Sequence, residues 1–256
     1  VEGILMPSTP RAKQVLTQEQ LERNGPGQTV LDSINIIPGV TFTNNDAYGS
    51  GGGQLSIRGF SADRISLTFD GLPLNDTGNY AIYSNQQLDP EIIDNVNVNL
   101  GSTDIDSPTA AASGSTVNYQ SRTPSEDMGA MISVSAGDYD MFRIFGMFDT
   151  GNLTSFGTRA FFAASNQRYE KFNGAPGELN KQQYNFRIFQ PIGSSGDFIS
   201  VAGHYNRNRN ASYNSGTALD FTLNRDFDNI GTSVRDRMND AIIANTTDSA
   251  GSWNQR

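Results

Sequence analysis

Two patterns of apolar and polar positions follow each other along the chain and meet near Pro124. Before Pro124 the apolar runs are short. Thr17 with Gln20 has the spacing of a capping box and predicts a first short helix; Thr29 predicts the cap of a second helix, which Pro38 ends. Five further short apolar runs predict strands, at residues 40–43, 54–58, 65–69, 96–100 and 116–120. This part of the chain is predicted to be a small α+β unit with long loops.

After Pro124 apolar and polar positions alternate with a period of two, as in strands that have one apolar face. We expect Ile188 to lie on the apolar face, and Asn185 and Arg187 on the polar one. Alternating segments of about ten residues with aromatic residues near their ends are typical of outer-membrane β-barrels. A soluble β-sandwich alternates in the same way. Five strands are predicted, around residues 130–136, 141–148, 158–169, 183–188 and 199–206.

The lengths of the connections between these strands favour the barrel. Gly137–Asp140 and Pro191–Gly196 are short, Glu170–Lys181 is longer and polar, and the chain from Asn208 to Gly251 is polar with little periodicity. Unequal connections suit a barrel that has turns at one rim and large loops at the other. Loops longer than about 15 residues are uncommon in compact domains.

Composition excludes several kinds of chemistry. The chain has 256 residues, no Cys, one His and a net charge of −9. Without Cys there are no disulfides, thiolate nucleophiles or zinc ribbons, and an acidic chain has no general electrostatic reason to bind nucleic acid. His204 lies on the polar side of its strand, so it is predicted to line the lumen rather than bind a metal. No run of about 18 apolar residues occurs, so no transmembrane helix is predicted.

Acidic residues do not point to catalysis or to a metal site. Asp and Glu are plentiful, but nothing in the sequence holds two of them at the defined separation that a glycosidase needs. Asp94, Asp104 and Asp106 lack the spacing of an EF-type calcium loop, and loop Asp residues usually cap turns. We therefore expect no enzyme activity, no cofactor and no bound metal.

Four motifs before Pro124 occur in a fixed order. They are Val30–Val40, Gln54–Phe60 (QLSIRGF), Ile65–Pro73 (ISLTFDGLP), and the pair Asp94–Gly101 with Gly114–Pro124. The set resembles the plug of TonB-dependent outer-membrane receptors: a helix and turn, the "IRG" strand, a strand and turn, and two closing strands. The resemblance covers about residues 14–124. It departs from the family at Leu100-Gly101-Ser102, where Arg-Gly-Pro is common.

The resemblance implies an α+β plug domain followed by antiparallel transmembrane β-barrel strands. Residues 1–124 would be the plug, and residues 125–256 the first strands and extracellular loops of an incomplete barrel. A barrel of about 22 strands has a lumen wide enough to need a plug. Five strands cannot close, and an open sheet edge is not viable in hydrocarbon. We therefore expect the sequence to be the N-terminal part of a longer receptor.

The implied function is uptake of a scarce nutrient across the outer membrane. The substrate would be a siderophore-type chelate or an oligosaccharide. The partners would be TonB, with its inner-membrane energising complex, and outer-membrane lipid, but not nucleic acid. The hydrophobic TonB box is not evident, although Val1–Met6 could be its remnant. The alternative is a soluble secreted β-rich module for binding or adhesion.

Three plug loops are predicted to reach the substrate: Asn44–Gly53, Ser61–Arg64 and Asn75–Gln87. Their amide, carboxylate and aromatic groups can bind a polar ligand while a ring packs on its apolar face. The predicted substrate-binding residues are Tyr48, Asp63, Asp76, Asn79, Tyr80 and Tyr83. The plainer interpretation is that these are solvated residues that suit turns. Arg58, in the "IRG" strand, is predicted to form an ion pair, either with the barrel or within the plug.

Overall fold

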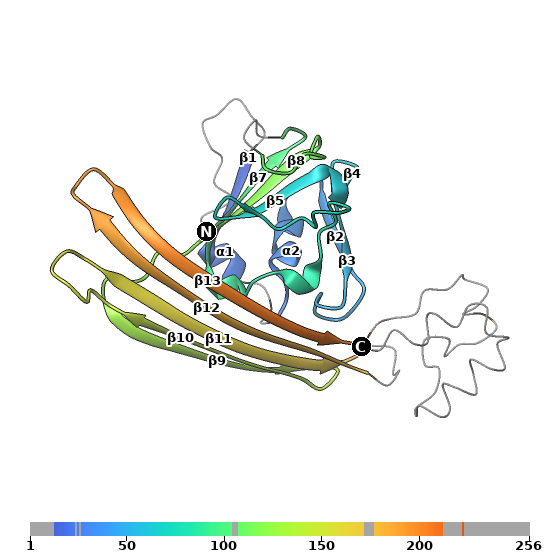
Figure 1. Cartoon of the computed structure of the whole chain (residues 1–256). Helices are drawn as coiled ribbons and strands as arrows, with labels where there is room; N and C mark the ends of the chain where they lie inside the picture. Colours follow the sequence, from blue (N-terminus) through green and yellow to red (C-terminus); the bar gives the residue numbers. More distant parts are fainter. Residues whose placement is uncertain are drawn as a thin grey trace.

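The computed structural model describes residues 13–23, 25, 27–103, 107–171, 177–211 and 222. These residues form two parts (Figure 1): a plug of short helices and strands, and a wall of five long strands that curves around one side of the plug. Val1–Met6, Asp104, Asp106 and most of the predicted loop after Asn208 lie outside the described residues.

Both predicted helices of the plug are present. Helix α1 (Gln18–Glu22) and helix α2 (Val30–Ser33) each begin with a capping box, made by Thr17 with Gln20 and by Thr29 with Asp32. A 3-10 turn, η1 (Ile34–Ile36), extends α2. In the described part of the chain no helix is long and apolar enough to cross a membrane.

The plug core is built on two small sheets. The larger has the order β1-β7-β8-β5-β6, with β5 and β8 parallel, and the smaller has the order β2-β3-β4. The strands are β1 (Lys13–Thr17), β2 (Val40–Asn44), β3 (Gly53–Ile57), β4 (Phe60–Ser61), β5 (Ile65–Phe69), β6 (Leu72–Pro73), β7 (Ile93–Leu100) and β8 (Ser115–Ser121). Three 3-10 turns connect them, η2 (Ala62–Arg64), η3 (Ser84–Gln86) and η4 (Pro90–Ile92). All five predicted plug strands are confirmed.

The wall is a single antiparallel sheet in chain order. Its strands are β9 (Met128–Gly137), β10 (Met141–Thr150), β11 (Arg159–Glu170), β12 (Glu178–Ile192) and β13 (Asp197–Asn210). The five strands and the fold class are therefore confirmed. The predicted loop from Glu170 to Lys181 was too long, because β12 already begins at Glu178 and pairs with the end of β11. Residues 178–181 are too polar to show the pattern of a lipid-facing strand.

The two faces of the wall differ as the alternation predicts. Ile188 is 41% exposed on the outer face, whereas Asn185 and Arg187 are buried against the plug. The ring of His204 lies 4.8 Å from that of Phe69, so it faces the plug as expected. Tyr169 lies near the end of β11 and is buried against the plug.

Candidate functional site

The three predicted loops meet around one groove of the plug, with a volume of about 670 Å³. The first loop contributes Asn45 and Gly51–Gly53, the second contributes Ser61–Asp63, and the third contributes Ala81–Asn85. The positions are set by β3, which continues from the first loop into the floor of the groove, and by the turns η2 and η3. The three loops therefore share one groove.

The lining of the groove is mostly uncharged. Tyr83 is 40% exposed and offers a ring and a hydroxyl. The only ionisable carboxylate among the lining residues is that of Asp63, which accepts a hydrogen bond from Ser61 and lies 3.5 Å from the Arg64 guanidinium. The Ser84 hydroxyl is buried and finds no hydrogen-bond partner among the described residues. The groove thus offers hydrogen-bonding groups, one aromatic ring and little net charge.

Three of the residues predicted to bind substrate lie outside this lining, in the turn that begins at Asp76. The Asp76 carboxylate accepts hydrogen bonds from the backbone N–H groups of Gly78 (2.7 Å) and Asn79 (3.2 Å). The Asn79 amide oxygen accepts one from the N–H of Ala81 at 3.0 Å. Tyr80 has a positive φ of 59° and its carbonyl accepts a bond from Asn75. These groups shape the loop, as expected of turn-forming residues.

Tyr48 joins the first loop to the wall. Its ring centroid lies 4.9 Å from that of Tyr169, and its hydroxyl donates to the Asp138 carbonyl at 3.1 Å. Beside it, the Asp46 carboxylate accepts a hydrogen bond from the Tyr169 hydroxyl (2.8 Å) and further ones from backbone N–H groups of its own loop. Burial raises the pKa of Asp46 above its ordinary value. Tyr48 therefore serves as an anchor between plug and wall.

Replacing Tyr169 by Phe should loosen this anchor. The Tyr169 hydroxyl donates to Asp46 and accepts from the Ser50 N–H at 3.1 Å, so the variant leaves the buried Ser50 N–H without this partner and removes one donor from Asp46. The expected cost is about 1–3 kcal/mol, measured as faster hydrogen exchange of the Ser50 and Gly51 amides. Tyr205→Phe is the control, because Tyr205 lies on the outer face of the wall. Equal exchange in the two variants would contradict the anchor.

Arg58 makes no ion pair among the described residues. It sits at the β3–β4 turn with a positive φ of 49°, and its guanidinium donates to the Leu100 carbonyl at 3.2 Å. The ion pair predicted for it, with the barrel or within the plug, is thus not seen in the described part of the chain. Its hydrogen bond to Leu100 links the β3–β4 turn to the end of β7.

The ion pairs between plug and wall involve other residues. Arg143 on β10 donates to both carboxylate oxygens of Glu91 (2.7 and 2.9 Å) and to Asp89 at 3.1 Å. Near the start of the wall, Arg122 pairs with Asp149 at 2.9 Å. Sequence reasoning missed these groups. The only signal was the alternation, which places Arg143 and Asp149 on the inner side of β10 without naming a partner.

Buried polar groups of the wall also bind the backbone that leads into the groove. Lys181 and Gln183 of β12 both donate to the Gln87 carbonyl, at 2.6 and 2.7 Å. On β13 the amides of Asn206 and Asn208 donate to the carbonyl of Asn85, which itself lines the groove. Hydrogen bonds therefore join the backbone beside the groove to the inner face of the wall.

Comparison with known families identifies the plug. Residues 7–115 match the model of the TonB-dependent Receptor Plug Domain. Residues 7–115 are therefore similar to a TonB-dependent receptor plug. None of the curated protein sequences matches the chain significantly.

Solved structures of two siderophore receptors and of a copper transporter share the fold of plug and wall. The ferripyoverdine receptor of the outer membrane of Pseudomonas aeruginosa, FpvA, is 24% identical, with a TM-score of 0.63 over 78% of this chain and 25% of its own. The siderophore receptor PiuA from Acinetobacter baumannii is 20% identical, with a TM-score of 0.60 over 78% and 26%. The copper transporter OprC is 18% identical, with a TM-score of 0.64 over 84% and 33%. The chain thus spans between a quarter and a third of these relatives.

Proposed function

We propose that this chain is the N-terminal part of a TonB-dependent outer-membrane receptor that takes up a scarce nutrient. The observation that carries the proposal is the groove of about 670 Å³ that all three predicted substrate loops share. The plug family and the fold of the wall support it. The plug–wall architecture also favours the receptor over a soluble adhesion module, because the outer face of the wall carries large exposed apolar side chains.

The lining of the groove favours a ligand of low charge. It offers amides from Asn45, Gln54 and Asn85, the ring of Tyr83, and the carboxylate of Asp63, but no Lys or Arg. A strongly anionic ligand would find no cationic side chain there. The names of FpvA and PiuA as siderophore receptors make a weakly charged siderophore-type chelate our first candidate. An oligosaccharide, which also binds through amides and an aromatic ring, is the second.

We further propose TonB, with its inner-membrane energising complex, as the partner that drives uptake. The hydrogen bonds that β12 and β13 of the wall donate to Asn85 and Gln87 of the plug support this, because a movement of the plug relative to the wall would break contacts beside the groove. Deleting TonB from the source cell should abolish accumulation of the nutrient but leave its surface binding intact. Uptake that persists without TonB would contradict this partner.

Replacing Tyr83 by Ala should weaken ligand binding by about tenfold or more, the range of an aromatic contact at the centre of a binding site. The full receptor, purified in detergent, is titrated with neutral ferric hydroxamates, ferric catecholates and maltooligosaccharides by calorimetry. Tyr80→Ala is the matched control, since Tyr80 belongs to the same loop but does not line the groove. The class of ligand that binds to the unmodified receptor identifies the class of substrate. Equal affinities of the two variants for that class would contradict the groove as its site.

A further inference from the structure

The outer face of the wall changes from apolar to charged along three neighbouring strands: a band of arginines comes first, and the exposed Glu170 and Glu178 follow as the last row. Aligned side chains of β11, β12 and β13 form successive rows, which the strand register defines. From the middle of the strands toward the end at Asn210, the rows are Ile188 with Val201, Phe162 with Phe186, Ala164 with Tyr184 and Tyr205, Asn166 with Gln182 and Arg207, and Arg168 with Asn180 and Arg209. No described element covers this face (Figure 1).

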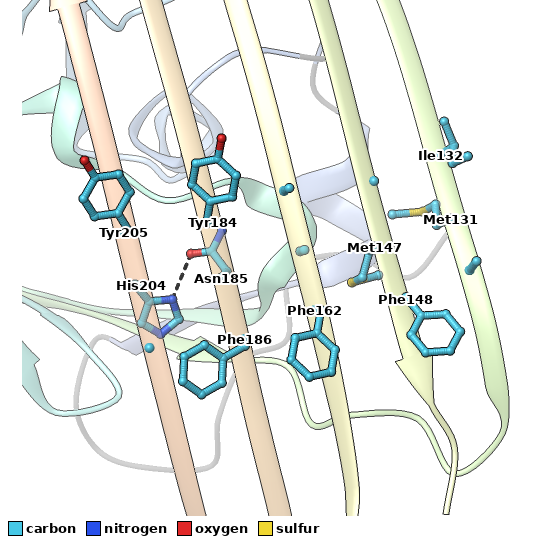
Figure 2. Close-up of a pocket in the computed structure, with 15 residues that line it drawn as sticks. Met131, Ile132, Met147, Phe148, Phe162, Tyr184, Asn185, Phe186, His204 and Tyr205 are labelled. Atoms are coloured by element: carbon cyan, nitrogen blue, oxygen red, sulfur yellow. Dashed lines mark hydrogen bonds between the residues drawn. The ribbon is translucent and has the colours of Figure 1, made fainter.

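The apolar rows line a shallow, open groove of about 810 Å³ across all five strands of the wall. At the centre of the groove the small residues Gly146 and Ala164 lie side by side, flanked by the larger side chains of Phe162 and Tyr184. Figure 2 shows Phe148, Phe162 and Phe186 in a row along one side of the groove, and Tyr184 and Tyr205 along the other. The tyrosine hydroxyls point away from the phenylalanine row, as in side chains whose polar ends seek a membrane interface.

Beyond the tyrosines lie three exposed arginines, Arg168, Arg207 and Arg209. None of them forms an ion pair with a described residue, although the chain carries a net charge of −9. Arg207 and Arg209 line a second cavity of about 330 Å³, together with Asn180, Gln182 and Glu178. Guanidinium groups bind phosphate through paired N–H donors, and neighbouring amides can supply further donors.

We propose that this outer face is a binding site for one phosphorylated lipid of the outer leaflet. Its headgroup phosphate binds Arg207 and Arg209, with Arg168 on the next strand but one as a further cation. Its acyl chains lie in the groove over Gly146 and Ala164. This inference rests on the proposed function in one respect: it requires that the wall lies in an outer membrane. It is separate from the nutrient groove, which lies on the plug.

Charge and polarity together select this occupant. A neutral acyl chain would account for the apolar groove but not for arginines that form no ion pair with a described residue, and a soluble phosphate would account for the arginines but not for the groove. The Tyr184–Tyr205 row lies between the two parts, where the hydrocarbon of a bilayer meets its headgroups. The loop that holds Tyr48 contacts the wall near the same end, at Asp138 and Tyr169, so the arginines lie on the side of the substrate loops. That side is the outer leaflet in the proposed receptor.

The test measures lipid binding to the full receptor in a neutral detergent by native mass spectrometry. The probes are diphosphoryl lipid A, its dephosphorylated form, and inorganic pyrophosphate. R207Q/R209Q should weaken binding of diphosphoryl lipid A by about 25-fold, from roughly fivefold for each arginine near an anionic headgroup. Added salt should weaken the wild-type complex in the same direction. R23Q/R64Q removes the same charge from exposed positions of the plug and should leave binding unchanged.

A second variant tests the apolar half of the site. A Cβ on Gly146 would meet no atom within 4 Å, so Gly146→Leu fills the groove without a clash. It should weaken lipid A binding severalfold and leave the weaker pyrophosphate binding as it was. Equal binding of both lipid forms, or pyrophosphate binding as tight as that of lipid A, overturns the inference. Nutrient uptake by the wild-type receptor tests the proposed function separately, so a transporting receptor without arginine-dependent lipid binding overturns this inference alone.

Discussion

Replacing Arg143 by Leu should destabilise the docking of the plug on the wall by about 3–5 kcal/mol, the range for removing one partner of a buried ion pair. Arg143 is 1% exposed and reaches Asp89 and Glu91 together. The loss is large because both carboxylates lose their guanidinium partner in a largely buried interface. The Ser165 hydroxyl, which donates to Asp89 at 2.6 Å, cannot compensate a charge on its own.

The measurement is hydrogen exchange of the β5 and β8 amides in the full receptor at increasing urea concentrations. Exchange of these plug strands should move to lower urea in Arg143→Leu, while exchange of the wall strands changes less. Arg159→Leu is the control: Arg159 pairs with Glu126, whose side chain is 70% exposed, and exposed pairs contribute about 0–1 kcal/mol. Similar shifts in the two variants would show that the Arg143 cluster does not hold the plug.

The elements of the plug could be predicted from the sequence because their signals are local. Thr17 with Gln20, and Thr29 at the start of α2, mark helix starts within four residues. Strand β1 was missed for the opposite reason. Its five residues are stabilised by pairing with β7, about 80 positions further along the chain, and carry no clear alternation of their own.

The candidate site was predictable only as a set of loops. All three loops meet at the groove, but which side chains line it depends on how each loop turns. Asp63 and Tyr83 line it, whereas Asp76 and Asn79 are used by their own turn. Tyr48 contacts Tyr169 of the wall, which lies 121 positions further along the chain, and no local sequence pattern predicts such a contact.

The sequence predicted which face of the wall carries polar residues, but not what those residues bind. Alternation places Gln183, Asn185 and Arg187 on one side of β12, and the structure confirms it. Their partners lie in the plug or on β13 and are often backbone carbonyls, such as that of Gln87. Backbone acceptors occur at every residue, so only the three-dimensional arrangement selects among them.

Replacing Ile188 by Arg should impair assembly of the receptor in the membrane. Ile188 projects from the outer face of β12, two rows away from Tyr184 toward the middle of the wall. A charge facing lipid near the midplane of a bilayer costs about 2–4 kcal/mol, since no water can solvate it there. The readout is the amount of folded, heat-modifiable receptor in the outer-membrane fraction, which should fall strongly.

Gln182→Arg provides the matched comparison for Ile188→Arg, because the two positions differ mainly in their depth in the bilayer. Gln182 lies on the same strand and face as Ile188, but beyond Tyr184, in the row of Asn166 and Arg207. The cost of an outward-facing Arg falls to about 0–1 kcal/mol near the interface, so this variant should assemble almost normally. Asn185 would be a poor comparison, since it is buried and hydrogen-bonded to His204. Equal assembly of the Ile188 and Gln182 variants would mean that Ile188 does not face lipid, and the wall would then have no membrane-facing side.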